Sequence, residues 1–293
     1  MDLLQLKALY QKDVNIIHHL EAQGLSRSES IAISYDLQAG SYIKYAQDNP
    51  EYTEDYASEI AGIFNGLGNE AESIMEVGVG EATTLANVRK RLEFEPDSIG
   101  FDISLSRVLF GRRYFSANGK GNAHFFVGDM FNMPYADDSV DIVYTSHTIE
   151  PNGGREREAL KELYRVTRKY LVLFEPSYEL ATPEGKNRID RLGYIKDLVN
   201  IASELGIKVI DYRLTKVCDN PLNPTAMLLI EKNPGAQSLR RADYCCPQTK
   251  KNLKLNHGCF WSDSSLTVYP IILDIPCLAI NHGIVATHYP EFI

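Results

Sequence analysis

Hydrophobic positions recur at helical spacing through the first part of the chain. Apolar side chains between residues 3 and 22 fall on one helical face, which ends near Gly24. A second helix is expected over about 26–42 and a third over about 54–64. Together they predict an N-terminal helical cap over residues 1–70.

From residue 73 the pattern changes to short apolar runs that alternate with amphipathic stretches. The runs that predict strands are Ile74–Val77, Ser98–Asp102, His124–Val127, Val140–Tyr144 and Tyr170–Glu175. Helices are expected from Thr84, from Ser104, over 155–166 and over 187–205. Strands that alternate with helices indicate a parallel sheet covered on both faces.

The last two strands of this region are expected to differ. The runs 208–212 and 226–230 are joined by a proline-bearing loop without a helix, so they most simply pair antiparallel. The fold class is therefore α/β, a doubly wound and mostly parallel seven-stranded sheet over 71–235. Residues 233–238 are typical of a linker, and 240–293 of a small β-rich module.

Charge and cysteine content narrow the classes of partner. The formal net charge is −9, which disfavours a large RNA or DNA substrate. The five cysteines all lie late in the chain and do not form a disulfide framework. No apolar stretch is long enough to span a membrane, and no unbroken apolar signal segment begins the chain. We therefore expect a cytoplasmic protein without a membrane partner.

The chemistry-bearing residues cluster where the expected strands end. The first strand runs into EVGVGEA at 76–82, in which Gly78 and Gly80 let the backbone approach a ligand at a helix N-terminus. A turn of this kind also fits a dinucleotide site. However, position 83 is threonine, where the third glycine of the dinucleotide fingerprint would stand.

Carboxylates end the next two strands. Asp102 closes the second strand, and Asp129 follows the third, beside Met130. Strand carboxyl ends line the ligand crevice of an open α/β sheet. Asp102 can accept hydrogen bonds from ribose hydroxyls, and Asp129 from an exocyclic amine while Met130 packs against the base. These residues favour a nucleoside cofactor without a diphosphate.

This combination resembles the class I S-adenosylmethionine-dependent methyltransferases, over roughly residues 30–232. Residues 76–82 are similar to the first motif of that family, with Ala82 in place of its last glycine. The resemblance implies an enzyme that uses S-adenosyl-L-methionine as cofactor. It gives cofactor-binding roles to Tyr35, Tyr42, Glu76, Gly78, Gly80, Asp102, Ile103, Asp129, Met130 and Thr145.

Two of these roles have equally good alternatives. Tyr35 and Tyr42 resemble a Y-D-x-x-A-x-x-Y helix that caps the cofactor, but packing of both rings against the sheet explains them equally well. Glu76 is equally a strand-end carboxylate satisfied by backbone N–H groups.

The segment 145–155, after the fourth strand, is where the resemblance places the methyl acceptor. His147 is the best candidate base because its ordinary pKa is near neutrality, with a loop hydrogen bond as the alternative role. Glu150 orients His147 or an amine, or is a loop carboxylate. The expected substrate contacts are Asn152, Arg155, Glu175 and Tyr178, and for Arg155 a solvated position is the alternative.

The last fifty or so residues resemble the zinc-ribbon-like family that activates several tRNA and protein methyltransferases as a separate subunit. CPQTKKNL at 246–253 and YPIILDIPCL at 269–278 carry this resemblance. Thr249 and Ser262 stand where two zinc-binding cysteines would be, so no metal site is expected. A basic patch is either solvated surface or an RNA contact, and its members are Arg240, Arg241, Lys250, Lys251 and Lys254.

The expected activity is methyl transfer to an oxygen or nitrogen of a small polar metabolite, such as a sugar or another biosynthetic intermediate. One alternative is an RNA or protein methyltransferase in which the fused module replaces the activator. Another is a non-catalytic cofactor-binding subunit. The sequence is also compatible with a homo-oligomer.

Overall fold

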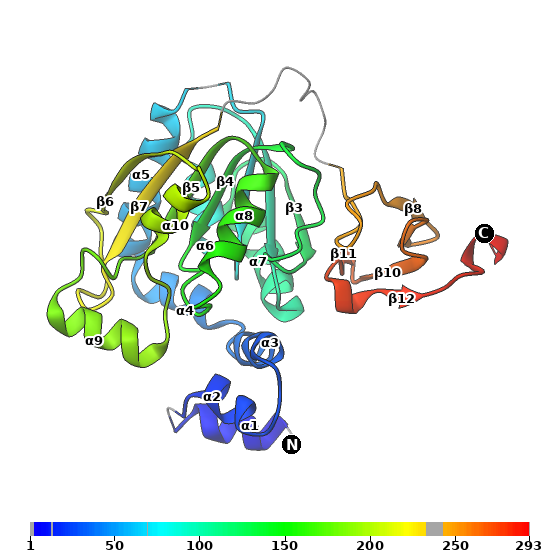
Figure 1. Ribbon diagram of the computed structural model, residues 1–293, viewed down its shortest axis with the longest axis horizontal. Coiled ribbons are helices and arrows are strands. Elements are labelled where there is room, and N and C mark those ends of the chain that lie inside the picture. Colours follow the sequence, from blue (N-terminus) through cyan, green and yellow to red (C-terminus); the bar gives the residue numbers. More distant parts are fainter. Residues whose placement is uncertain (1–2, 13, 69, 233–242, 293) are drawn as a thin grey trace.

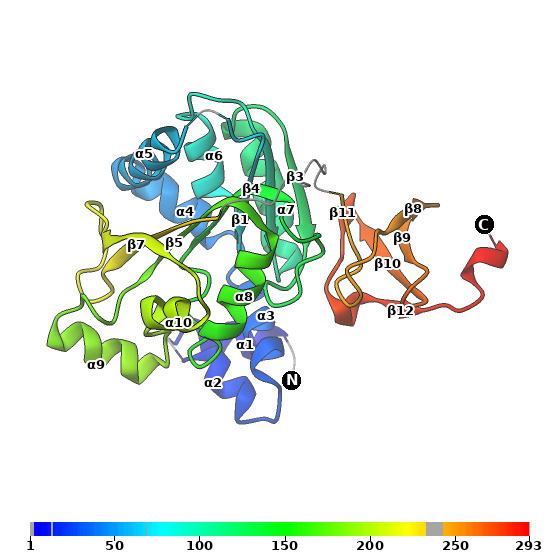
Figure 2. The same cartoon turned by 45° about the horizontal axis from the view of Figure 1, so that its top comes forward.

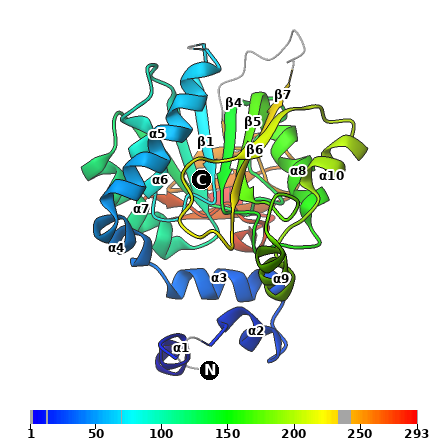
Figure 3. The ribbon, with the colours of Figure 1, turned by 90° about the vertical axis from the view of Figure 1, so that its left-hand side faces the viewer.

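The computed structural model describes residues 3–12, 14–68, 70–232 and 243–292. A sheet with helices on both faces forms the main body, and α1–α3 gather at one end of it (Figure 1, Figure 3). The helices are α1 (Leu3–Tyr10), α2 (Ile16–Glu21), α3 (Arg27–Leu37), α4 (Ser41–Asp48), α5 (Pro50–Gly66), α6 (Thr83–Arg89), α7 (Leu105–Asn118), α8 (Glu156–Val166), α9 (Pro183–Leu192), α10 (Leu198–Glu204) and the 3₁₀ turns η1 (Ile280–His282) and η2 (Tyr289–Phe292). The strands are β1 (Ser73–Val77), β2 (Asp97–Asp102), β3 (Ala123–Val127), β4 (Val140–Ser146), β5 (Thr167–Pro176), β6 (Val209–Leu214), β7 (Thr225–Glu231), β8 (Lys254–Asn256), β9 (Cys259–Ser262), β10 (Thr267–Ile272), β11 (Ile275–Pro276) and β12 (Ile284–Val285).

The main sheet has seven strands in the order β3-β2-β1-β4-β5-β7-β6. The pairs from β3 to β5 are parallel, and β7 is antiparallel to both β5 and β6. The predicted fold class, including the antiparallel final pair, is confirmed. The strand order reverses between β1 and β4, and their carboxyl ends therefore open the crevice where ligands bind in this class of sheet.

Two apolar layers enclose the sheet. Side chains of β1 alternate between them, because successive residues of a strand point to opposite faces. Ile74 packs in the layer that includes Phe64 of α5, whereas Met75 packs in the layer that includes Leu160 of α8. All four side chains are fully buried. This packing fixes β1, and with it the position of the glycine turn that follows.

The N-terminal helices are shorter and more numerous than expected. The predicted helix over 3–22 is interrupted, because Asn15 caps α2 by accepting a hydrogen bond from the backbone N–H of His18. The predicted helix over 26–42 breaks at Gly40, whose φ is +99°. Tyr35 and Tyr42 therefore lie on different helices.

A third helix prediction was also wrong. The expected helix over 187–205 is divided into α9 and α10, because Gly193 adopts a left-handed conformation with φ of +65° and ends α9. No helix in the described part of the chain is long and apolar enough to cross a membrane.

The C-terminal residues form a separate antiparallel sheet that lies beside β3 (Figure 1, Figure 2). Val127 of β3 forms a parallel bridge with Cys277, and the N–H of Leu278 donates to the carbonyl of Val127 at 2.7 Å. The module therefore pairs with the edge strand β3 at its last residue, Val127. The predicted linker 233–238 lies outside the described residues, as do Arg240 and Arg241 of the predicted basic patch.

Side chains reinforce this contact. The Tyr244 ring packs edge-on against Phe126 of the main sheet at 5.4 Å and against Phe260 of the module at 5.3 Å. Lys250 pairs with Glu162 of α8 at 2.9 Å. The module is thus held by backbone, aromatic and ionic contacts.

Candidate active site

A cavity of about 830 Å³ lies where the ends of β1, β2 and β4 meet the N-terminal helices. Its wall includes every predicted cofactor residue except Thr145. Thr145 is fully buried inside β4, and strand alternation turns its neighbour Ser146 toward the cavity instead. Thr145 thus lies behind the cavity wall, and its contact with the cofactor stays a prediction.

The glycine turn has a left-handed backbone at three positions. Gly78, Gly80 and Ala82 have φ of +67°, +52° and +56°. A Cβ atom at Gly78 would lie 2.2 Å from the side chain of Thr148, whose hydroxyl donates to the carbonyl of Val77 at 2.8 Å. Gly78 therefore lets the loop after β4 pass across the turn.

Asp102 joins this turn to the end of β2. Its Oδ2 accepts from the N–H of Gly80 at 3.0 Å, and its Oδ1 from the N–H of Ser104 at 2.9 Å. Burial raises the pKa of this carboxyl. Asp129 is half-buried at the end of β3, where its Oδ1 accepts from the N–H of Phe131 at 3.0 Å. The two predicted carboxylates thus share one cavity and keep further acceptor lone pairs.

Glu76 lies deeper in the same wall. Its Oε2 accepts from the Tyr144 hydroxyl at 2.8 Å, and the side chain is almost fully buried. Burial raises its pKa to about 8. This carboxyl is therefore mostly protonated at neutral pH until a cation approaches it.

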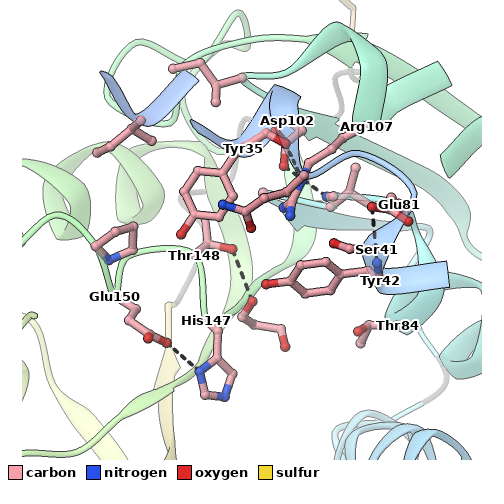
Figure 4. A pocket seen from close by; sticks show the side chains of 18 of the residues that line it. Tyr35, Ser41, Tyr42, Glu81, Thr84, Asp102, Arg107, His147, Thr148 and Glu150 are labelled. Atoms are coloured by element: carbon pink, nitrogen blue, oxygen red, sulfur yellow. Dashed lines mark hydrogen bonds and ion pairs between the residues drawn. The ribbon is translucent and has the colours of Figure 1, made fainter. Parts of the chain in front are cut away.

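Glu81 has a role that the sequence analysis missed. It is buried, its Oε1 accepts from the N–H of Gly40 at 2.9 Å, and its Oε2 from the N–H of Ile43 at 2.8 Å. Figure 4 shows it beside Ser41 and Tyr42 at the start of α4. The carboxylate fixes α4 against the glycine turn, a contact across about forty residues that no local pattern indicates.

His147 and Glu150 are brought together, as expected, on the far side of the cavity (Figure 4). His147 Nδ1 lies 2.7 Å from Glu150 Oε2, and Nε2 lies 2.8 Å from the hydroxyl oxygen of Thr225. Burial lowers the pKa of His147, but the Glu150 carboxylate outweighs it, and the pKa is raised overall. The pair thus combines a titratable ring with a carboxylate that stabilises its charged form.

Of the four predicted substrate contacts, only one lies on the cavity wall. Asn152 lies on the cavity wall. Glu175 does not, because it is buried beneath the loop after β4 and accepts from the backbone N–H groups of Thr148, Ile149 and Glu150 at 2.9–3.1 Å. It shapes the loop rather than the cavity surface.

Arg155 and Tyr178 also lie away from the cavity wall. The Arg155 guanidinium packs 3.5 Å from the centre of the Phe131 ring and pairs with Glu158. Tyr178 lies in the segment between β5 and α9, with the ammonium of Lys196 over its ring. Neighbouring side chains engage both residues, and their roles as substrate contacts stay predictions.

Several wall residues carried no local signal in the sequence. They are Tyr45, Tyr52, Tyr56, Ser146, Tyr194, Asp219, Asn220, Asn223 and Thr225. The Tyr56 hydroxyl lies 3.0 Å from Ser146 Oγ, and the Tyr52 and Tyr56 rings stack at 5.9 Å. These residues come from α4, α5, the end of β4, the segment between α9 and α10, and the start of β7 with the loop before it, so only the tertiary fold assembles them.

Comparison with known proteins agrees with this geometry. Residues 74–170 match a family model described as a methyltransferase domain. Over these residues the chain is similar to a methyltransferase domain. This match supports a methyltransferase activity with S-adenosylmethionine as cofactor.

A curated relative of the methyltransferase domain is ajmaline N-methyltransferase of Rauvolfia serpentina, which is 23% identical over 179 residues. The match covers 54% of this chain and 59% of the relative, so the chain spans about three fifths of that protein's length.

One solved structure shares the fold, and others are similar to parts of the chain. Magnesium protoporphyrin IX methyltransferase of Synechocystis, with bound S-adenosylhomocysteine, has a TM-score of 0.52 and 12% identity, over 69% of this chain and 99% of that one. A methyltransferase of Aquifex aeolicus has a TM-score of 0.44 and 16% identity, over 58% and 87% of the two chains.

Proposed function

We propose that this protein transfers the methyl group of S-adenosylmethionine to an oxygen or nitrogen of a small polar metabolite, such as a sugar or another biosynthetic intermediate. The observation that carries the proposal is one cavity that joins Asp102 and Asp129 at the strand ends to the His147–Glu150 pair. On one side of the cavity, the two aspartates offer hydrogen-bond acceptors to a nucleoside. On the other side, the His147–Glu150 pair is placed to take a proton from the molecule that is methylated.

The cofactor half of the cavity fits the group that this domain uses. S-adenosylmethionine, when bound, supplies a methyl group on a positively charged sulfur. Asp102 would accept from its ribose hydroxyls, and Asp129 from its adenine amine while Met130 and Ile103 pack on the base. Gly78 and Gly80 keep the turn free of side chains. The orphaned Nη2 of Arg107 also points to a ligand on this side.

His147 acts as the base when the acceptor must lose a proton. With Nδ1–H donating to Glu150, Nε2 is the nitrogen that takes a proton, either through the Thr225 hydroxyl that donates to it at 2.8 Å or directly once that hydroxyl turns away. Glu150 then stabilises the imidazolium. The remaining catalysis comes from alignment of the acceptor for in-line displacement.

The size and lining of the cavity support a small acceptor. About 830 Å³ lies within the range of small-molecule sites. Its outer wall carries hydroxyls, amides and the carboxylates of Glu150 and Asp219, which suit an acceptor rich in hydroxyl or amino groups. The name of the Rauvolfia relative is in line with a nitrogen acceptor.

The C-terminal module supports a second candidate, an RNA or protein methyltransferase with a fused activator. The observation that favours this candidate is the contact of the module with β3, where Val127 bridges to Cys277. Against RNA, two lysines of the predicted basic patch already have acidic partners, since Lys250 pairs with Glu162 and Lys254 with Asp263. We therefore retain a small molecule as the acceptor.

We propose further that the module, residues 240–293, folds without zinc, as a third part beside the cap (1–70) and the methyltransferase domain (71–235). The hydroxyls of Thr249 and Ser264 are hydrogen-bonded, and Ser264 Oγ lies 3.2 Å from Ser262 Oγ. Cys246 Sγ lies 3.4 Å from Ser265 Oγ. Among the described residues no group of three histidine, cysteine or acidic side chains is arranged to hold a metal. Hydroxyls thus bond to one another where zinc ligands would stand.

The test is methyl transfer from methyl-labelled S-adenosylmethionine to hydroxyl- and amine-bearing metabolites, with total tRNA as a parallel acceptor. The proposal predicts turnover on small acceptors that is greatly reduced in His147→Ala. Methylation of tRNA alone would favour the second candidate. Binding of S-adenosylhomocysteine without turnover on any acceptor would indicate a non-catalytic subunit.

A further inference from the structure

Arg107 of α7 places a buried positive charge on the cofactor side of the cavity. The residue is 4% exposed, and its Nε donates to the carbonyl of Tyr35 at 3.1 Å. Its Nη2 is buried and has no hydrogen-bond partner. Burial lowers the pKa of Arg107, but Asp102, Tyr42 and Tyr35 together raise it overall, so the guanidinium stays charged. A buried N–H of a charged group without a partner is costly and calls for an acceptor.

The two candidate capping tyrosines hold this guanidinium in place. Its central carbon lies 4.7 Å from the centre of the Tyr35 ring and 4.5 Å from that of Tyr42. Figure 4 shows Arg107 grouped with both rings and with Asp102 at one end of the cavity. Cation–π contacts of this kind fix the direction in which the free N–H group points.

The rest of the wall makes this charge distinctive. Among the described residues that line the cavity, Arg107 is the only arginine or lysine. The acidic residues on the same wall are Glu76, Glu81, Asp102, Asp129, Glu150 and Asp219. An anionic group that enters the cavity would therefore be repelled almost everywhere except beside Arg107.

We propose that Arg107 binds the carboxylate of the amino-acid part of the cofactor. The inference rests on the proposed function, because it needs S-adenosylmethionine in this cavity. That molecule carries a sulfonium, an ammonium and one carboxylate, and the carboxylate matches a guanidinium in charge and geometry. Tyr35 and Tyr42 are then positioning residues that aim Arg107, a role distinct from capping the cofactor directly.

A calorimetric comparison of two ligands tests this role. Decarboxylated S-adenosylhomocysteine keeps the nucleoside, the thioether and the amine of S-adenosylhomocysteine and lacks only the carboxylate. Wild type should bind the complete molecule at least about tenfold more tightly. In Arg107→Gln this preference should disappear, while affinity for the decarboxylated ligand stays close to that of wild type. Arg107→Lys should keep part of the preference, because it keeps the charge but not the forked geometry.

Two further variants separate this role from a structural one. Arg113→Gln removes an exposed charge from the same helix and should leave the ligand preference intact. Tyr42→Leu should reduce the preference without abolishing binding of the decarboxylated ligand, which also reports that the variant is folded.

The outcomes are distinct. Equal weakening of both ligands by Arg107→Gln would make the residue structural and overturn the proposal. Unchanged affinity for S-adenosylhomocysteine would overturn it too, and would leave a carboxylate of the methyl acceptor as the partner. If wild type bound neither ligand, the proposed function itself would fail.

Discussion

Glu76 is a buried carboxyl whose surroundings favour its neutral form. Burial raises its pKa to about 8, and the Tyr144 hydroxyl is the hydrogen-bond donor that lies against it. Its ordinary pKa is about 4.5, so the folded protein binds an extra proton between about pH 4.5 and 8. Stability should fall as the pH rises through that window.

A cationic cofactor beside Glu76 should lower this pKa and release a proton on binding. Calorimetry of S-adenosylmethionine at pH 7 without a methyl acceptor, in buffers that differ in ionisation enthalpy, would measure the release. Glu76→Gln should abolish it and should flatten the pH dependence of stability across the same window. An unchanged proton count in Glu76→Gln would assign the release to another group.

The His147–Glu150 pair predicts how activity depends on pH. A base must be neutral to accept a proton, and Glu150 raises the pKa of His147. The acidic limb of the profile of kcat/KM should therefore lie above the ordinary histidine value of about 6.5. Glu150→Gln should move that limb to lower pH and reduce the maximal rate. A limb that does not move in Glu150→Gln would show that His147 is not the base.

At the scale of elements, the glycine turn explains what the sequence analysis could and could not predict. Asp102 and Asp129 were predictable because they end strands, and strands follow from apolar runs. The break at Gly40 was not predictable, because helical periodicity continues across it and its partner, Glu81, lies in another element. The same holds for Arg107, which sits within a helix and gains its significance only from Tyr35 and Tyr42.

Ala82 offers a test of strain in this turn. It adopts φ of +56° at the N-terminus of α6, where the resembled family has glycine. The left-handed conformation costs a non-glycine residue about 1–2 kcal/mol, and glycine gains about 0.4–1 kcal/mol of unfolded-state entropy. Ala82→Gly should therefore raise the free energy of unfolding by up to about 1 kcal/mol in urea titrations. A clear loss of stability would mean that the buried methyl group stabilises the turn by more than the strain costs.

At the scale of the molecule, the C-terminal module and the main sheet should behave as one unit. Lys250 joins them by donating to the carbonyl of Met133 at 3.1 Å and pairing with Glu162. Lys250→Ala should lower the free energy of unfolding by about 1 kcal/mol. Lys251→Ala, at an exposed neighbouring position, should have little effect. Equal values for the two variants would show that the ion pair does not stabilise the docked module.

The docking of this module lay beyond sequence analysis for a physical reason. Lys250 and Met133 are 117 residues apart, and a surface lysine has the same local pattern whether it is solvated or paired. The fold class was accessible because periodicity repeats along the chain. The acceptor side of the cavity could not be predicted in the same way. Glu175, Arg155 and Tyr178 were expected there because they follow strands in the sequence, but none of them lines the cavity.

The central claim is that the glycine turn and the carboxylates of β2 and β3 bind S-adenosylmethionine. Calorimetric titration of the full chain with S-adenosylhomocysteine and, separately, with NAD tests it most directly. The account predicts one bound S-adenosylhomocysteine per chain, at least about tenfold weaker binding in Asp102→Asn, and no heat from NAD. Binding of NAD without binding of S-adenosylhomocysteine would contradict it.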